Sequence, residues 1–214
     1  AAGAAVVVLE ARSGEVYALV ADEDKPFEPG PAVKIVATAA EIEDTREAGP
    51  DRYAELLRSF GLGDRTGIGL PGENPGAVPD RRTWSGPVFD QLRQGKGLAV
   101  TVLQLAGVYQ AVANGGVRTP PRIVKDVPGP EGVRVISERT ADAVRDTLKL
   151  PRSLPGYQIA GVAGGHTFAG ILPAGDPRFV IGIALNPGER TDPLFHDIAS
   201  YLAQRFRIPA AAQP

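Results

Sequence analysis

The sequence GLAVTVLQLAGVYQAVANGGVRTPPRI occupies residues 97–123. Within it, apolar side chains recur at positions i, i+3, i+4 and i+7, which places them on one stripe of a helix: Leu105, Val108, Tyr109 and Val112. Asn114-Gly115-Gly116 predicts the end of this helix, because glycine tolerates the left-handed conformation of a C-terminal cap. Pro120-Pro121 then predicts an extended exit. These patterns together predict a core helix followed by an extended segment.

Composition limits the classes to which the chain can belong. Its 214 residues, 43% hydrophobic and 22% charged, suit a single globular domain over residues 1–214. The net charge of −2 predicts no nucleic-acid partner. No apolar run approaches the roughly 20 residues of a membrane span, so we expect no membrane insertion by this segment. Met is absent even at position 1, which indicates a processed or excised piece of a longer protein.

We expect neither a cofactor nor a metal site. The chain has no Cys, which excludes disulfides, thiolate ligands and a cysteine nucleophile. The only histidines, His166 and His196, are far apart in sequence and have no spacing typical of metal ligands.

The N-terminal half predicts a hairpin and a helix. Residues 4–10 and 15–21 are β-rich runs joined by a short turn, and the nearly continuous apolar character of the first predicts a strand covered on both faces. Residues 51–63 predict a helix capped by Asp51 and ended by Gly61. We interpret the remaining segments as turns or loops, with Trp84 as a partly buried surface aromatic: residues 22–30, 43–50 and 74–96.

The C-terminal half alternates strands and helices. Residues 179–185 are entirely apolar and predict a central strand. Ser137 predicts the cap of a helix over residues 138–148. Asp192 and Pro193 predict the start of a last helix whose inward face carries Phe195, Ile198, Leu202 and Phe206. Short strands are predicted at Ile123-Val124 and over residues 133–136, a turn over 150–156, and a frayed tail over 208–214.

The literal residues of the opening stretch resemble a known family. Gly95-Lys-Gly-Leu-Ala-Val-Thr101, Gln104-Leu105 and Ala113-Asn-Gly-Gly116 closely resemble a signature of the class B penicillin-binding proteins, the D,D-transpeptidases that cross-link peptidoglycan. Thr66-Gly-Ile-Gly-Leu-Pro-Gly-Glu73 resembles a second family stretch. The resemblance implies an α+β, β-lactamase-like transpeptidase fold with shortened loops. In that fold an antiparallel sheet, built from the N-terminal hairpin and the C-terminal strands, is flanked by helices on both faces.

The resemblance also implies where three catalytic motifs of the family would lie in this chain. The first of them lacks one of its catalytic residues here. Pro29-Gly30-Pro31 and Lys34 resemble the family stretch E-P-G-S-x-x-K, which begins a central helix. In the family the lysine lies one turn after the serine and takes the proton of its hydroxyl. Lys34 is present, but Pro31 occupies the serine position and has no hydroxyl.

The other two motifs are also not intact. No S-x-N, S-x-D or Y-x-N occurs, and the eight residues 43–50 are too few for the missing helices. The family K-T-G motif, whose lysine and threonine bind the substrate carboxylate, reads Val162-Ala163-Gly164 and is followed by Gly165. His166 to Gly170 resembles the family's H-A-W-F-x-G. A residual groove is predicted from Lys34, Thr101, Gln104, Gly164, Gly165 and His166.

The prediction that follows is a pseudo-transpeptidase: a binding or scaffolding module in peptidoglycan and cell-envelope assembly, outside the cytoplasmic membrane. Its expected partners are cell-envelope proteins, with the peptidoglycan stem peptide as a candidate ligand. The alternative is an active penicillin-binding enzyme, or a trimmed derivative of one, in which an unaligned serine such as Ser13, Ser59 or Ser85 reaches Lys34.

Overall fold

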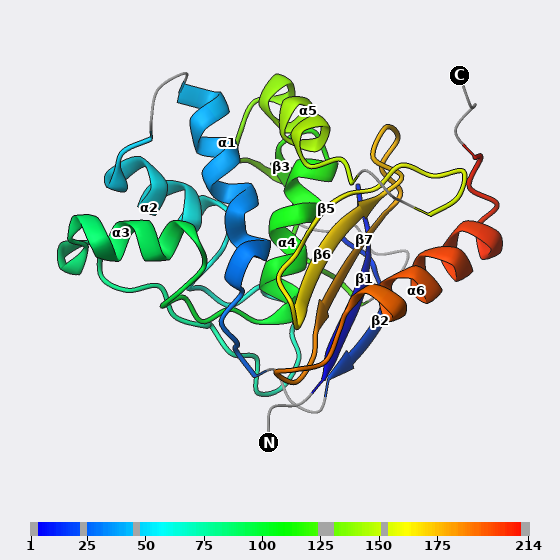
Figure 1. Cartoon of the computed structure of the whole chain (residues 1–214), viewed down its shortest axis with the longest axis horizontal. Helices are drawn as coiled ribbons and strands as arrows, with labels where there is room; N and C mark the ends of the chain where they lie inside the picture. Colours follow the sequence, from blue (N-terminus) through cyan, green and yellow to red (C-terminus); the bar gives the residue numbers. More distant parts are fainter. Residues whose placement is uncertain (1–3, 22–24, 45–47, 124–130, 151–153, 211–214) are drawn as a thin grey trace.

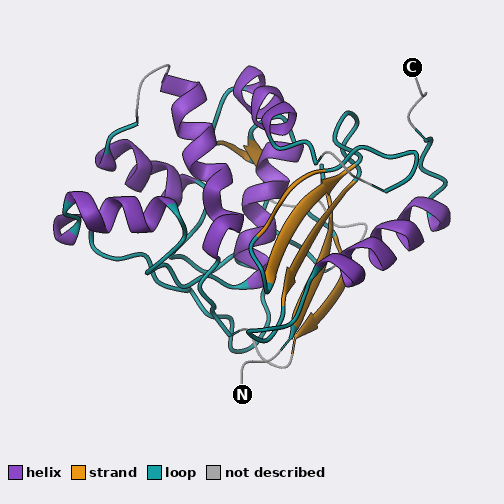
Figure 2. Ribbon diagram, in the orientation of Figure 1, coloured by secondary structure: helices purple, strands orange, loops and turns teal. Residues whose placement is uncertain are grey.

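The computed structural model describes residues 4–21, 25–44, 48–123, 131–150 and 154–210. Its centre is a five-stranded antiparallel sheet in the order β2-β1-β7-β6-β5 (Figure 1). The strands are β1 (Ala5–Glu10), β2 (Val16–Ala21), β5 (Ala160–Ala163), β6 (Thr167–Leu172) and β7 (Phe179–Ala184). Helices cover both faces of this sheet (Figure 2), which confirms the predicted fold class.

The N-terminal hairpin and the C-terminal strands pair in one sheet, as predicted. β1 lies between β2 and β7, and its adjacent residues Val7 and Val8 are buried in the clusters on opposite faces of the sheet. Both faces of β1 are therefore covered, which confirms the prediction made from its continuous apolar run. β7 is the middle strand of the sheet, also as predicted, and β5 lies at one edge.

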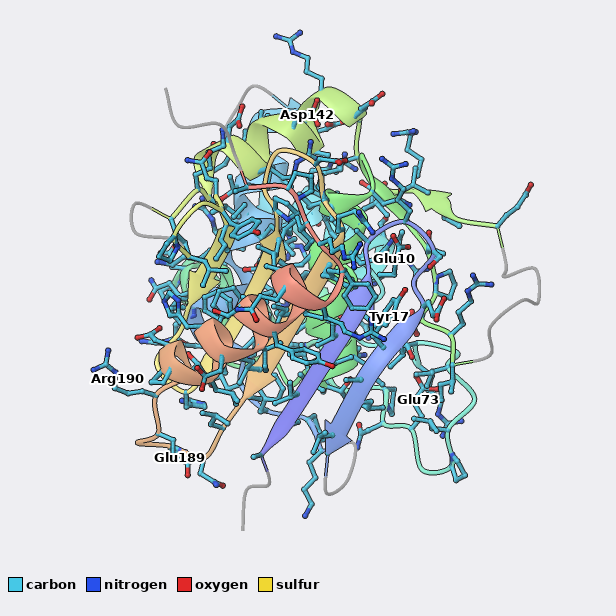
Figure 3. All side chains as sticks on the ribbon, turned by 90° about the vertical axis from the view of Figure 1, so that its right-hand side faces the viewer. Glu10, Tyr17, Glu73, Asp142, Glu189 and Arg190 are labelled. Atoms are coloured by element: carbon cyan, nitrogen blue, oxygen red, sulfur yellow. The ribbon has the colours of Figure 1, made fainter. Side chains whose placement is uncertain are left out.

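One face of the sheet, called the inner face below, carries most of the helices. α4 (Val102–Ala113) packs on β1, β6 and β7, and α1 (Lys34–Asp44), continuing from the short helix η1 (Gly30–Val33), lies beside α4. α5 (Glu138–Thr147) packs against α1 and α4, and α2 (Pro50–Ser59) and α3 (Gly86–Arg93) pack against α1. α6 (Asp192–Arg205) crosses the opposite, outer face (Figure 3), where it contacts β6 and β7.

α4 is more deeply buried than its apolar stripe predicts. Of its residues only Gly107 is not fully buried, because the sheet, α1 and α5 surround the helix. Its polar side chains find partners in distant backbone: Tyr109 donates a hydrogen bond to the carbonyl of Ala32, and Gln110 donates one to the carbonyl of Ala11. The helix ends before Asn114, as predicted.

Several local predictions are corrected. Residues 74–96 are not only loop, since they contain the short helix η2 (Arg81–Thr83) and α3. Trp84 is buried rather than partly exposed: it packs against Tyr53 and Phe89, and its indole N–H donates to the carbonyl of Pro79. Packing among these three aromatic rings is what makes a helix favourable in a segment rich in Gly and Pro.

Two predicted helix caps are wrong, and the described residue of one predicted strand is not in a strand. α2 begins at Pro50, with Gly49 as its N-cap, so Asp51 lies in the first turn. α6 likewise has Thr191 as its N-cap, and Asp192 lies in the first turn. Ile123 is not in a strand, and Val124 lies outside the described residues. The partner of β4 (Val133–Arg134) is instead β3 (Val117–Arg118).

Ser137 caps α5 as predicted and also anchors α1. Its hydroxyl accepts from the N–H of Thr140 and donates to the Glu43 carboxylate at 2.9 Å. Burial acts to raise the pKa of Glu43, but hydrogen bonds from Thr140 and Ser137 favour the carboxylate, so the pKa of Glu43 lies below its ordinary value. In the part of the chain that the structure describes, no helix has both the length and the apolar character needed to cross a membrane.

Candidate functional site

Three stretches that are distant in sequence meet at the start of α1. η1 packs against β5 and β6, and the loop before α4 approaches the first residue of η1. At Gly95, which has φ +78°, a Cβ atom would collide with the backbone of Gly30. Gly97 donates its N–H to the Glu28 carboxylate at 3.1 Å. The close approach of Gly95 to Gly30 explains why this loop needs glycine.

The positions of the first and third motifs, at Pro31 and at Gly164, lie side by side. A Cβ atom added to Gly164 would collide with the hydroxyl of Thr167 and lie 3.2 Å from Cδ of Pro31. Thr167, which is fully buried, donates its hydroxyl to the carbonyl of Pro29 at 3.0 Å. The buried hydrogen bond from Thr167 to Pro29 and the absence of a side chain at Gly164 therefore hold the segment around Pro31 against the turn between β5 and β6.

The two residues of β5 that precede Gly164 carry no polar side chain. Val162 is half-buried and pairs with Ala169, and Ala163 is exposed and pairs with Phe168. Gly164 donates its N–H to the carbonyl of Thr167 at 2.7 Å, which closes the turn to β6. No atom lies within 4 Å of the position that a Cβ atom would take on Gly165, and His166 is half-buried. The end of β5 thus presents its backbone without a lysine or arginine side chain.

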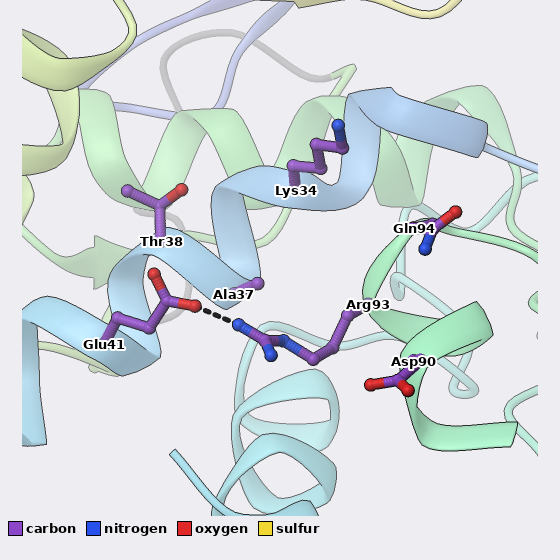
Figure 4. Close-up of a pocket in the computed structure, with 7 residues that line it drawn as sticks. All are labelled: Lys34, Ala37, Thr38, Glu41, Asp90, Arg93 and Gln94. Atoms are coloured by element: carbon purple, nitrogen blue, oxygen red, sulfur yellow. Dashed lines mark hydrogen bonds and ion pairs between the residues drawn. The ribbon is translucent and has the colours of Figure 1, made fainter. Parts of the chain in front are cut away.

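Lys34 lines a groove of about 430 Å³ between α1 and α3 (Figure 4). The other side chains that line this groove are Ala37, Thr38 and Glu41 of α1, and Asp90, Arg93 and Gln94 beside them. Glu41 and Arg93 form an ion pair across it. Lys34 is exposed, and its side-chain amine has no ion pair or hydrogen bond with any residue that the structure describes.

Among the residues that the structure describes, no serine lines the groove around Lys34. The hydroxyl group in this groove belongs to Thr38, one turn further along the same helix. Ser13 lies in the turn between β1 and β2, where its hydroxyl accepts from the N–H of Glu15. Ser59 is the last residue of α2, and Ser85 precedes α3. The alternative prediction of an unaligned serine at Lys34 gave these three as examples, and none of them lies among the groove residues.

Two of the predicted groove residues are wrong. Thr101 and Gln104 are buried and form the capping box of α4: Gln104 donates its N–H to the Thr101 hydroxyl, and its side-chain oxygen accepts from the Thr101 N–H at 2.9 Å. The Gln104 side chain also donates to the carbonyls of Asp64 and Pro75, both at 2.7 Å. Both residues shape the fold rather than line the groove.

The sequence analysis did not predict the residues that line the groove opposite α1. Asp90, Arg93 and Gln94 lie in a segment that we predicted to be loop. The signal was present, since Ser85-Gly86-Pro87 places an N-cap residue and a proline at a helix start. Among the described residues, no group of three or more His, Cys, Asp or Glu side chains is arranged to hold a metal ion.

Comparisons with known proteins agree with this geometry. Residues 42–198 match the family model described as penicillin binding protein transpeptidase domain. The chain is 34% identical over 330 residues to penicillin-binding protein PbpB of Mycobacterium tuberculosis, covering 97% of this chain and 49% of that protein. It is 34% identical over 152 residues to peptidoglycan D,D-transpeptidase FtsI of Escherichia coli, covering 59% of this chain and 26% of that protein.

The fold is similar to that of a solved relative. The crystal structure of penicillin-binding protein 3 from Mycobacterium tuberculosis complexed with ampicillin matches with a TM-score of 0.91 and 33% identity, covering 99% of this chain and 74% of that chain. The chain spans about half the length of the curated relatives it matches first. The alignment with PbpB extends over 330 positions, whereas this chain has 214 residues. More than a hundred aligned positions of PbpB therefore face gaps in this chain, in agreement with shortened loops.

Proposed function

Because the chain belongs to the penicillin-binding protein transpeptidase family, we propose that it is a member without acyl transfer that acts as a binding or scaffolding module. The observation that carries the proposal is the position of Pro31, which packs 3.2 Å from the place of a Cβ atom on Gly164. Acyl transfer needs a group that can attack a carbonyl carbon and lose a proton. The ring of proline has neither a hydroxyl nor an N–H.

The neighbouring positions support the same proposal. A substrate carboxylate would need a cation or hydroxyl donors at the end of β5, and Val162 and Ala163 provide neither. Lys34 keeps its amine, but the described residues that line its groove include no serine. Nucleophile, proton relay and carboxylate anchor act as a unit in catalysis, so the loss of even one of them removes most of the rate.

We assign this module to peptidoglycan and cell-envelope assembly, outside the cytoplasmic membrane, with envelope proteins as its partners. The support is the family and the names of the relatives, which are peptidoglycan transpeptidases and penicillin-binding proteins. A stem peptide is a second candidate ligand, because β5 is an edge strand and an extended peptide can add to such an edge through backbone hydrogen bonds.

A labelling experiment tests the loss of acyl transfer. The chain is incubated with a fluorescent penicillin and read by denaturing gel and intact mass, beside the FtsI protein of Escherichia coli as a positive control. We expect no adduct on this chain. The matched variant combines Pro31→Ser, Val162→Lys and Ala163→Thr, which returns two of the three motifs, and we expect it to gain slow but detectable labelling.

A stoichiometric adduct on the unmodified chain would contradict the proposal and favour an active enzyme. Peptide mapping would then identify the nucleophile, with Thr38, Ser13, Ser59 and Ser85 as the hydroxyls to check first. Labelling of the variant without labelling of the parent would show that the scaffold still holds the family geometry and that side-chain chemistry alone is missing.

A further inference from the structure

The groove beside Lys34 carries two charged side chains of opposite sign that have no partner among the described residues. Lys34 lies on its α1 wall and Asp90 on its α3 wall, and both are exposed. Neither side chain forms an ion pair or a hydrogen bond with a residue that the structure describes. The other two charged side chains of the groove, Glu41 and Arg93, neutralise each other in an ion pair. A ligand that enters the groove therefore meets an unpaired cation and an unpaired anion.

The ion pair between Glu41 and Arg93 fixes how the two walls of the groove face each other. Lys34 precedes Glu41 on α1 by about 10 Å along the helix axis, and Asp90 lies about one turn before Arg93 on α3. Figure 4 shows Lys34 at one end of the groove, with Gln94 across from it, and Asp90 beyond the ion pair at the other end. The two unpaired charges thus lie at opposite ends of the groove and do not contact each other.

The spacing of these two charges sets the length of a ligand that contacts both. They lie about 10 to 14 Å apart along the groove by the rise of the two helices. A charge-assisted hydrogen bond takes about 2.8 Å at each end, so the charged groups of the ligand would be about 5 to 8 Å apart. In an α-amino acid both groups are bonded to the same carbon, which is too short. An extended chain of six single bonds of about 1.5 Å spans about 7 Å and fits.

The wall between the two charges suits a narrow, unbranched ligand. Ala37 and Thr38, in the middle of the α1 wall, have short side chains that leave room along the helix. The groove has a volume of about 430 Å³, within the range of small-molecule sites, roughly 300 to 1,000 Å³. The side-chain amide of Gln94 adds a hydrogen-bond donor at the end of the groove that Lys34 occupies. This end therefore favours a carboxylate.

We propose that this groove binds a linear dipolar ion of the ω-amino carboxylate class, with its carboxylate at Lys34 and its ammonium group at Asp90. This inference rests on the proposed function as a binding module and names the ligand chemistry of the groove. Lys34 acts here as an anchor for an anion rather than as a base. The two opposite charges also fix the direction of the ligand, because the reverse direction would bring like charges together.

A nuclear magnetic resonance titration tests the ligand, because it detects weak binding and shows where it occurs. The probe is 6-aminohexanoate, added to the isotope-labelled 214-residue chain. Exposed ion pairs contribute little each, so we expect binding at millimolar concentrations, with shifts in the backbone amides of residues 34–41 and 90–94. Glycine lacks the length and hexanoate lacks the ammonium group, so each is expected to bind about fivefold more weakly.

Charge-exchange variants test the two anchors. Lys34→Glu and Asp90→Lys are each expected to weaken binding of 6-aminohexanoate about tenfold, because each brings like charges together. The double variant exchanges the two ends of the groove, so it is expected to bind the reversed ligand within about twofold of the parent. The matched controls are Lys149→Glu and Asp64→Lys, which do not line the groove and should leave binding unchanged. Circular dichroism checks that all variants fold.

The absence of shifts along α1 and α3, equal binding of hexanoate, or a double variant as weak as the single ones would overturn the proposal. Nα-acetyl-lysine presents the same two charged groups as the C-terminal lysine of a polypeptide. Binding as tight as that of 6-aminohexanoate would assign the ligand to a polypeptide end, and weaker binding would assign it to a free small molecule.

The penicillin-labelling result is separate from this titration. An adduct would contradict the proposed function and leave the shifts with 6-aminohexanoate in place. The absence of both adduct and shifts would contradict only the ligand of the groove.

Discussion

The start of α4 and the end of β5 both resemble the same family, but they keep different kinds of residue. At α4 the family residues Thr101 and Gln104 remain, and both are buried in a capping box that also holds two loops. At β5 only Gly164 of the K-T-G positions remains, and it is the one that packs against Pro31. The comparison teaches that the family residues kept at these two places are buried or tightly packed, whereas the differing positions 162 and 163 are half-buried or exposed.

The largest effect is expected when a retained residue of the α4 capping box is removed. Gln104→Ala removes the partner of the Thr101 N–H and the donors to the carbonyls of Asp64 and Pro75. Buried backbone groups left without partners cost about 1 kcal/mol or more each, so we expect a loss of about 3 kcal/mol in the free energy of unfolding. Urea titration measures it. The control Gln94→Ala, at an exposed position, should stay within about 0.5 kcal/mol.

A smaller effect is expected where the site still constrains the backbone. In Gly164→Ala the added methyl collides with the Thr167 hydroxyl and presses on Pro31, which separates η1 from β5. We expect a loss of about 2 kcal/mol, typical of overpacking. Gly175→Ala is the matched control, since nothing lies within 4 Å of its Cβ position. If both variants unfold at the same urea concentration, the contact between Pro31 and Gly164 is not part of the packed structure.

The smallest effect is expected at Lys34. Its amine is exposed and has no ion pair or hydrogen bond with a described residue, so Lys34→Ala should change the free energy of unfolding by less than about 0.5 kcal/mol. The same variant in the background of Pro31→Ser, Val162→Lys and Ala163→Thr should abolish any regained penicillin labelling, because the serine would lose its base. A loss above 1 kcal/mol in the parent would mean that Lys34 is kept for stability.

Local patterns predicted some elements and missed others for identifiable reasons. The hairpin, the middle strand β7 and the capped helix α5 follow from strong periodicity or from a cap residue. α3 was missed because it is short and, of its residues, only Leu92 is fully buried. A helix of this length is marginal in isolation, and here it depends on the packing of Phe89 against Trp84 and Tyr53.

The sequence by itself determined what the motif positions can do chemically. A proline at position 31 and small or apolar residues at 162–165 lack hydroxyl and amine groups in any conformation. Only the tertiary structure decided that Pro31 meets Gly164 and that Thr101 and Gln104 lie inside rather than along a groove. The reason is that side-chain chemistry is local, whereas burial and contact depend on segments that are far apart in the chain and meet only when it folds.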